Sequence, residues 1–71
     1  MLSSMTGIAD KVQSALMKDP RMKKADIDVS CTRGIVTLTG KVKSEEAREA
    51  AEEIARAQDG VTTVINELKV G

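Results

Sequence analysis

The segment "RGIVTLTGKV", residues 33–42, alternates apolar and polar residues between two glycines. A period of two is typical of a half-buried strand, and here it turns Val36 and Leu38 toward a core. The opposite face of the strand then carries Ile35, Thr37 and Thr39. Gly34 suits the positive φ that a short hairpin loop requires, and Gly40 is expected to mark a bulge or the close approach of a neighbouring backbone. The segment therefore predicts a strand that follows a tight turn and ends at its second glycine.

The residues on the N-terminal side of this strand predict a helix, a loop and another strand. Apolar residues recur at helical spacing from about Thr6 to Lys18, and Thr6 or Ser4 is the expected helix cap. Asp19-Pro20 ends the helix, because the residue before a proline is pushed away from helical angles. After a loop, "IDVSCT", residues 27–32, alternates as a strand. The turn at residues 33–34 joins the two strands into an antiparallel hairpin.

The residues on the C-terminal side predict a second helix and a last strand. Ser44 is a good N-cap, and the helix runs from there to about Gln58. Small alanines on its inner face let it lie close to a sheet. Gly60 suits the left-handed position after a helix end, and "VTTVINELKV", residues 61–70, is the closing strand. The strand–helix–strand unit makes the second and third strands parallel, with a right-handed crossover.

Together these elements predict an α+β fold of order αββαβ, a mixed three-stranded sheet with two helices packed on one face. The side chains expected in its core are Ile8, Val12, Leu16, Ile27, Val29, Val36, Leu38, Ala47, Ala51, Ile54, Val64 and Leu68. The solvated outer face of the second helix is expected to carry Arg48, Glu49, Glu52, Glu53 and Arg56. We expect residues 1–5 to be a flexible leader and residues 6–71 to form one domain.

Composition excludes several classes of function. None of the 71 residues is aromatic, which removes stacking platforms for nucleic-acid bases. The formal net charge is zero, so no nucleic-acid partner is expected. Histidine is absent, no ligand set resembles a zinc or calcium site, and the lone Cys31 is expected to be buried and inert. The sequence predicts no catalytic residue, no metal, no cofactor and no enzyme.

The sequence shows no membrane-spanning or export segment. No apolar run approaches the roughly 20 residues that span a bilayer. The opening "MLSSMTGIAD" has neither a basic start nor a continuous apolar stretch, so it does not resemble a signal peptide.

Residues 34–70 resemble the core of a BON domain, named for bacterial OsmY and nodulation proteins. The resemblance rests on the strand with Gly40, the spacing of Val42, Ser44 and Ala50, the Gly60-Val61 step and the closing "VINELKV". Residues 8–29 also fit the first helix and strand of that family. The resemblance implies the αββαβ fold, no catalytic motif, and structural roles for Gly34, Gly40 and Gly60.

The resemblance also implies a binding function. Members of the family are mostly bacterial envelope proteins, often with tandem copies, and are proposed to bind phospholipid or attach to membranes. Some cytoplasmic members pair the domain with a LysM module and bind potassium. The implied location is therefore the bacterial periplasm or envelope, with the cytoplasm as the alternative. The implied partner is an anionic phospholipid surface, and potassium binding is a further option.

Two surfaces are candidate sites. Residues 17–24, here called the basic segment, are expected to present apolar tips within a ring of cations toward anionic lipid: Met17, Lys18, Arg21, Met22, Lys23 and Lys24. The alternative is a solvated loop with incidental methionines. The uncovered face of the sheet is expected to carry Ile35, Thr37 and Ile65, which suits a protein partner, or else it is an ordinary threonine-rich surface. The isolated chain is expected to be a monomer.

Overall fold

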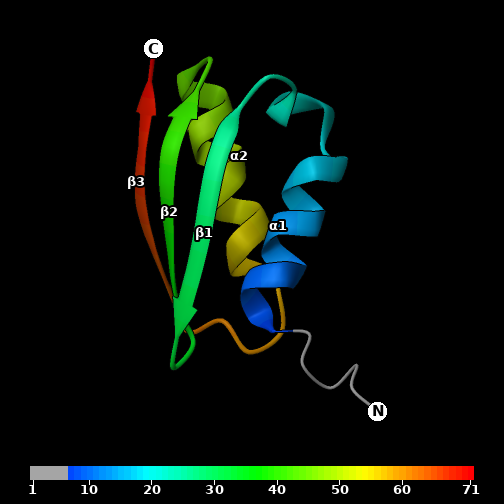
Figure 1. Cartoon of the computed structure of the whole chain (residues 1–71), viewed down its shortest axis with the longest axis vertical. Coiled ribbons are helices and arrows are strands. Elements are labelled where there is room, and N and C mark those ends of the chain that lie inside the picture. The colour runs from blue at the N-terminus through cyan, green and yellow to red at the C-terminus, as the bar shows by residue number, and fades with distance from the viewer. Residues whose placement is uncertain (1–6) are drawn as a thin grey trace.

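The computed structural model describes residues 7–71 (Figure 1), so the expected leader at residues 1–5 and the expected caps Ser4 and Thr6 lie outside the described residues. The elements run α1 (Ile8–Lys18), a short 3₁₀ helix η2 (Pro20–Met22), β1 (Asp26–Thr32), β2 (Ile35–Val42), α2 (Glu45–Arg56) and β3 (Thr63–Val70). Gly7 occupies the N-cap position of α1, and Asp19 ends this helix in an extended conformation. At α2, the Oγ of Ser44 accepts a hydrogen bond from the N–H of Ala47 at 3.1 Å, as a helix cap does.

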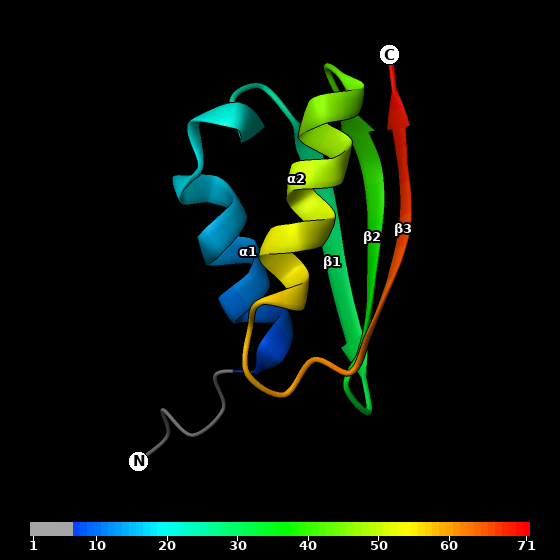
Figure 2. The same ribbon diagram turned by 180° about the vertical axis from the view of Figure 1, so that it is seen from behind.

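The three strands form one mixed sheet in the order β1-β2-β3. β1 and β2 are antiparallel, with Val29 opposite Leu38, whereas β2 and β3 are parallel, with Val36 opposite Val64. Both helices lie on the same face of this sheet, which is seen nearly edge-on in Figure 2. The predicted α+β fold is confirmed, including the crossover through α2.

Glycines shape the middle strand. Arg33 and Gly34 have φ of 55° and 82°, the two positive values of a tight hairpin turn, and Thr32 pairs directly with Ile35 across it. At Gly40, with φ of 121°, an added Cβ would overlap the carbonyl oxygen of Asp26 on β1. The close approach expected at Gly40 is therefore confirmed. The strand does not end there, however: it continues to Val42, because the glycine lets β1 pass closely without breaking the pairing.

The core lies between the sheet and the two helices. Its buried side chains are Val12, Leu16, Met22, Val36, Leu38, Val42, Ala47, Ala50, Ala51, Ala55 and Leu68. Ile8, Ile27, Val29, Ile54 and Val64, predicted as core, pack against this cluster while half-buried. Cys31 also packs there and is half-buried rather than fully buried, because it lies near the hairpin end of the edge strand β1.

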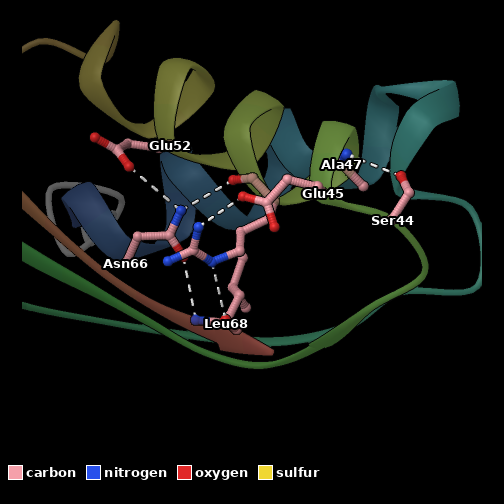
Figure 3. A network of polar contacts seen from close by, with 7 residues as sticks. Ser44, Glu45, Ala47, Glu52, Asn66 and Leu68 are labelled. Atoms are coloured by element: carbon pink, nitrogen blue, oxygen red, sulfur yellow. Dashed lines mark hydrogen bonds and ion pairs between the residues drawn. The ribbon is translucent and has the colours of Figure 1, made fainter. Parts of the chain in front are cut away.

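The sequence predicts Arg48 on the solvated outer face of α2, but the structure places its side chain against β3. Its Nε donates a hydrogen bond to the carbonyl oxygen of Leu68 on β3 at 3.1 Å (Figure 3). The long side chain reaches from the helix to the sheet, a contact that a helical pattern of charges does not show. Glu52 and Arg56, four residues apart on the same helix, form an ion pair at 2.6 Å.

Candidate functional site

The basic segment is built around a hydrogen-bonded turn after α1. The Asp19 carboxylate accepts hydrogen bonds from Arg21 at its backbone N–H (2.8 Å), its Nε (3.0 Å) and its Nη2 (2.8 Å). Because these bonds from Arg21 stabilise the charged carboxylate, they lower the pKa of Asp19 from 3.8 to about 2. The positive charge of Arg21 is therefore engaged within the turn.

Met22 is a correction to the predicted site. The sequence places it as an exposed apolar tip, but it is only 7 % exposed and belongs to the core. The reason is η2: three residues wound as a 3₁₀ helix behind the Asp19 cap turn the third residue inward. Met22 then lines a small pocket with Leu16 of α1 and Ile27 of β1.

Four residues of the basic segment, Met17, Lys18, Lys23 and Lys24, have exposed side chains. Met17 is 76 % exposed in the last turn of α1. Lys18, Lys23 and Lys24 are exposed, and none of them forms an ion pair within residues 7–71. Lys24 has a φ of 65°, so the chain turns sharply there before β1 begins. An apolar side chain thus stands among three cations on one end of the molecule.

Further lysines that sequence reasoning missed lie at this same end. β1 begins where β2 and β3 end, so Lys41 and Lys69 lie side by side in register, and Lys43 follows β2. We call Lys18, Lys23, Lys24, Lys41, Lys43 and Lys69 the basic end. Asp26 lies beside Lys41, and α2 begins there with Glu45 and Glu46, yet basic residues outnumber acidic ones. The sequence does predict that β2 and β3 pair in parallel, and this pairing is the signal that could have placed Lys41 beside Lys69.

The uncovered sheet face brings together the other three predicted residues. Ile65 of β3 lies opposite Thr37 of β2, and Ile35 lies opposite Thr63, so the two isoleucines are diagonal neighbours. Ile35 is 40 % exposed and Ile65 is 42 % exposed. Both helices lie on the opposite side of the sheet (Figure 2). The face is apolar only at these two points, among threonines and charged residues.

The described part of the chain holds neither a metal-binding cluster nor a membrane-spanning helix. Among residues 7–71, no group of three or more histidine, cysteine, aspartate or glutamate residues is arranged to hold a metal ion. In the same residues, neither helix has the length and apolar character needed to cross a membrane.

Comparison with known proteins identifies the family. The sequence model of the BON domain matches residues 4–71. The chain belongs to the BON domain family. It is 37 % identical to the "Osmotically-inducible protein Y" of Escherichia coli (strain K12) over 65 residues. That alignment covers 92 % of this chain and 32 % of the relative. It is 34 % identical to a "21 kDa hemolysin" of Actinobacillus pleuropneumoniae over 65 residues, and that alignment covers 90 % of this chain and 34 % of the relative.

This BON domain spans about a third of the length of these curated relatives. The name of the first relative refers to osmotic induction and the name of the second to haemolysis.

Proposed function

We propose that this BON domain is a non-enzymatic module that attaches weakly to anionic phospholipid surfaces in the bacterial envelope. The observation that carries the proposal is Met17, 76 % exposed, on the same part of the surface as Lys18, Lys23 and Lys24, which form no ion pair with any residue from 7 to 71. Each cation near an anionic leaflet contributes about 1 kcal/mol, and the methionine adds apolar contact. The name of one relative, a hemolysin, also supports a membrane-facing role.

The basic end explains why such attachment would be weak and dependent on salt. The lysines are spread over α1, the turn and two strand ends, and Arg21 is neutralised by Asp19. Exposed charges are screened over about 10 Å at 0.1 M salt. Binding therefore requires low or moderate ionic strength, or additional copies of the domain in a longer protein.

The test is an NMR titration of the labelled domain with phosphatidylglycerol vesicles and, separately, with phosphatidylcholine vesicles. We expect shift changes at residues 17–24 with the anionic lipid alone, and their loss at high salt. Lys23→Glu with Lys24→Glu should abolish the response. The matched control reverses two exposed cations outside the basic end, Lys11→Glu with Arg33→Glu, and should leave residues 17–24 responsive. If both double variants bind equally well, the basic segment is not the docking surface.

A second candidate function, docking of a protein partner, is favoured by the exposure of Ile35 and Ile65 on the face that no helix covers. If a vesicle titration leaves every amide shift unchanged, docking of a protein partner at Ile35, Thr37 and Ile65 becomes the favoured function. The variant Ile35→Ser with Ile65→Ser separates the two functions, because it should leave any lipid response intact.

A further inference from the structure

The edge of the sheet at β3 has backbone groups that do not face β2. The N–H of Thr63 donates to the carbonyl of Gly34 at 3.3 Å, and the N–H of Gly71 donates to that of Val42 at 3.1 Å, so the odd-numbered residues turn toward β2. Because alternate residues of a strand turn their backbone groups to opposite sides, Leu68 turns its N–H and C=O to the free edge. Such an edge is a template for another strand.

Two side chains occupy this edge (Figure 3). The Nε of Arg48 donates to the Leu68 carbonyl oxygen at 3.1 Å, and the Oδ1 of Asn66 accepts from the Leu68 N–H at 3.1 Å. Both backbone groups that Leu68 offers to a neighbouring strand are therefore already bonded. We call Arg48 and Asn66 the Leu68 clamp.

The clamp is itself fastened to α2. The Nδ2 of Asn66 donates to the carbonyl oxygen of Arg48 at 2.9 Å and to the Oε1 of Glu52 at 3.4 Å. The Nη1 of Arg48 donates to the Oε2 of Glu45 at 2.8 Å. Each clamp side chain thus has a second bond that holds it in place over the strand edge.

The charges on β3 favour one pairing with a second copy of the chain. If two β3 strands approach antiparallel with Leu68 opposite Leu68, Glu67 of each copy lies opposite Lys69 of the other, a favourable cross-strand pair. If the pairing is centred on residue 67 instead of residue 68, Glu67 of one copy lies opposite Glu67 of the other, and the two like charges repel. In the favoured register, the two leucines exchange both N–H···O bonds. Those are the groups that the clamp occupies.

We propose that Arg48 and Asn66 close the free edge of β3 against antiparallel pairing with the β3 of a second copy of this chain. The clamp competes for the central hydrogen bonds of that pairing, and a second copy has to displace it. The edge is in this way a latent interaction surface that the domain keeps occupied by its own side chains.

The test compares the clamp with a matched arginine on the same helix. Arg56 forms an ion pair with Glu52 through its Nη2 but makes no hydrogen bond to β3. We expect Arg48→Ala with Asn66→Ala to sediment as a dimer as its concentration rises from micromolar to millimolar. The parent chain and Arg56→Ala should stay monomeric. Concentration-dependent amide shifts of the double variant should centre on residues 63–70.

Three results would overturn the proposal. A folded double variant that stays monomeric at millimolar concentration shows that the clamp does not hold back pairing. A dimer whose shift changes lie away from β3 uses another surface. A parent chain that dimerises through residues 63–70 as readily as the double variant has an edge that is not closed.

Hydrogen exchange in the parent chain tests the clamp even if the double variant does not fold. Each of the two arginines pairs with a glutamate on α2, but only Arg48 donates its Nε to the backbone. We expect the Nε–H of Arg48 to exchange roughly two- to tenfold more slowly than that of Arg56, as one net hydrogen bond implies. Equal exchange rates would contradict the clamp.

Discussion

Arg33 holds a backbone conformation that favours asparagine or glycine, with a φ of 55° in the two-residue turn between β1 and β2. A β-carbon is disfavoured in the left-handed region, and Asn-Gly is the preferred pair for this turn. Arg33→Asn is therefore expected to raise the free energy of unfolding by about 0.5–1 kcal/mol. Urea denaturation measures the gain. Arg33→Ala removes the cation but lacks the short amide side chain that hydrogen-bonds locally in this conformation, so an equal gain from alanine would assign the effect to charge.

The turn after α1 depends on the charge of Asp19, so the protonation of this carboxylate can be followed as a test of the turn. Its pKa falls from 3.8 to about 2 because of the hydrogen bonds from Arg21. A carboxylate with a lowered pKa stabilises the folded state above the unfolded value of 3.8, and that stabilisation is lost as pH falls through about 2. The carboxyl carbon shift of Asp19, followed by NMR, should titrate near 2. Titration near 3.8 would show that the contact with Arg21 does not persist in solution.

At the scale of the element, regular patterns were predictable from the sequence and irregular ones were not. Periods of two and 3.6 locate the strands and helices, and the glycines mark the hairpin and the close approach at Gly40. A three-residue 3₁₀ helix has no such period, so the sequence does not predict that Met22 is buried. The local pattern also does not predict the contact of Arg48 with β3, because that contact joins residues 20 apart in the chain.

The candidate site was predictable only where it follows the chain locally. Met17, Lys18, Lys23 and Lys24 are neighbours in sequence and reach the surface together. Lys41 and Lys69 join the basic end through strand pairing, so the complete set depends on topology rather than on a local run of charges.

The short turn η2 permits a matched comparison of two methionines. Met22 is 7 % exposed and Met17 is 76 % exposed, although they lie five positions apart. Met22→Ala should lower the free energy of unfolding by about 2–5 kcal/mol, the usual cost of truncating a buried methionine. Met17→Ala should change it by less than about 0.5 kcal/mol. Urea denaturation of both variants checks the difference, and equal midpoints would mean that η2 does not hold Met22 inside.

At the scale of the whole molecule, stability depends on a thin core of small aliphatic side chains. The 71-residue chain contains no aromatic residue, and domains of this size bury only about 60 % of the surface that the unfolded chain exposes. At about 0.05–0.15 kcal/mol per residue, the total free energy of unfolding is on the order of 4–11 kcal/mol. A single large cavity would therefore remove a large part of it.

Leu38 is where this narrow margin can be tested. It is fully buried on the middle strand, between β1 and β3 and beneath the helices. Leu38→Ala should cost about 2–5 kcal/mol, enough to leave a marginally stable domain of this size partly unfolded without denaturant. Thr37→Ala, one position earlier on the uncovered face, should change the free energy by less than about 0.5 kcal/mol. Denaturation followed by circular dichroism compares the two, and a midpoint that Leu38→Ala leaves in place would put Leu38 on the wrong face of the sheet. Because strand side chains alternate between faces, that one comparison reports which side of the entire sheet the helices cover.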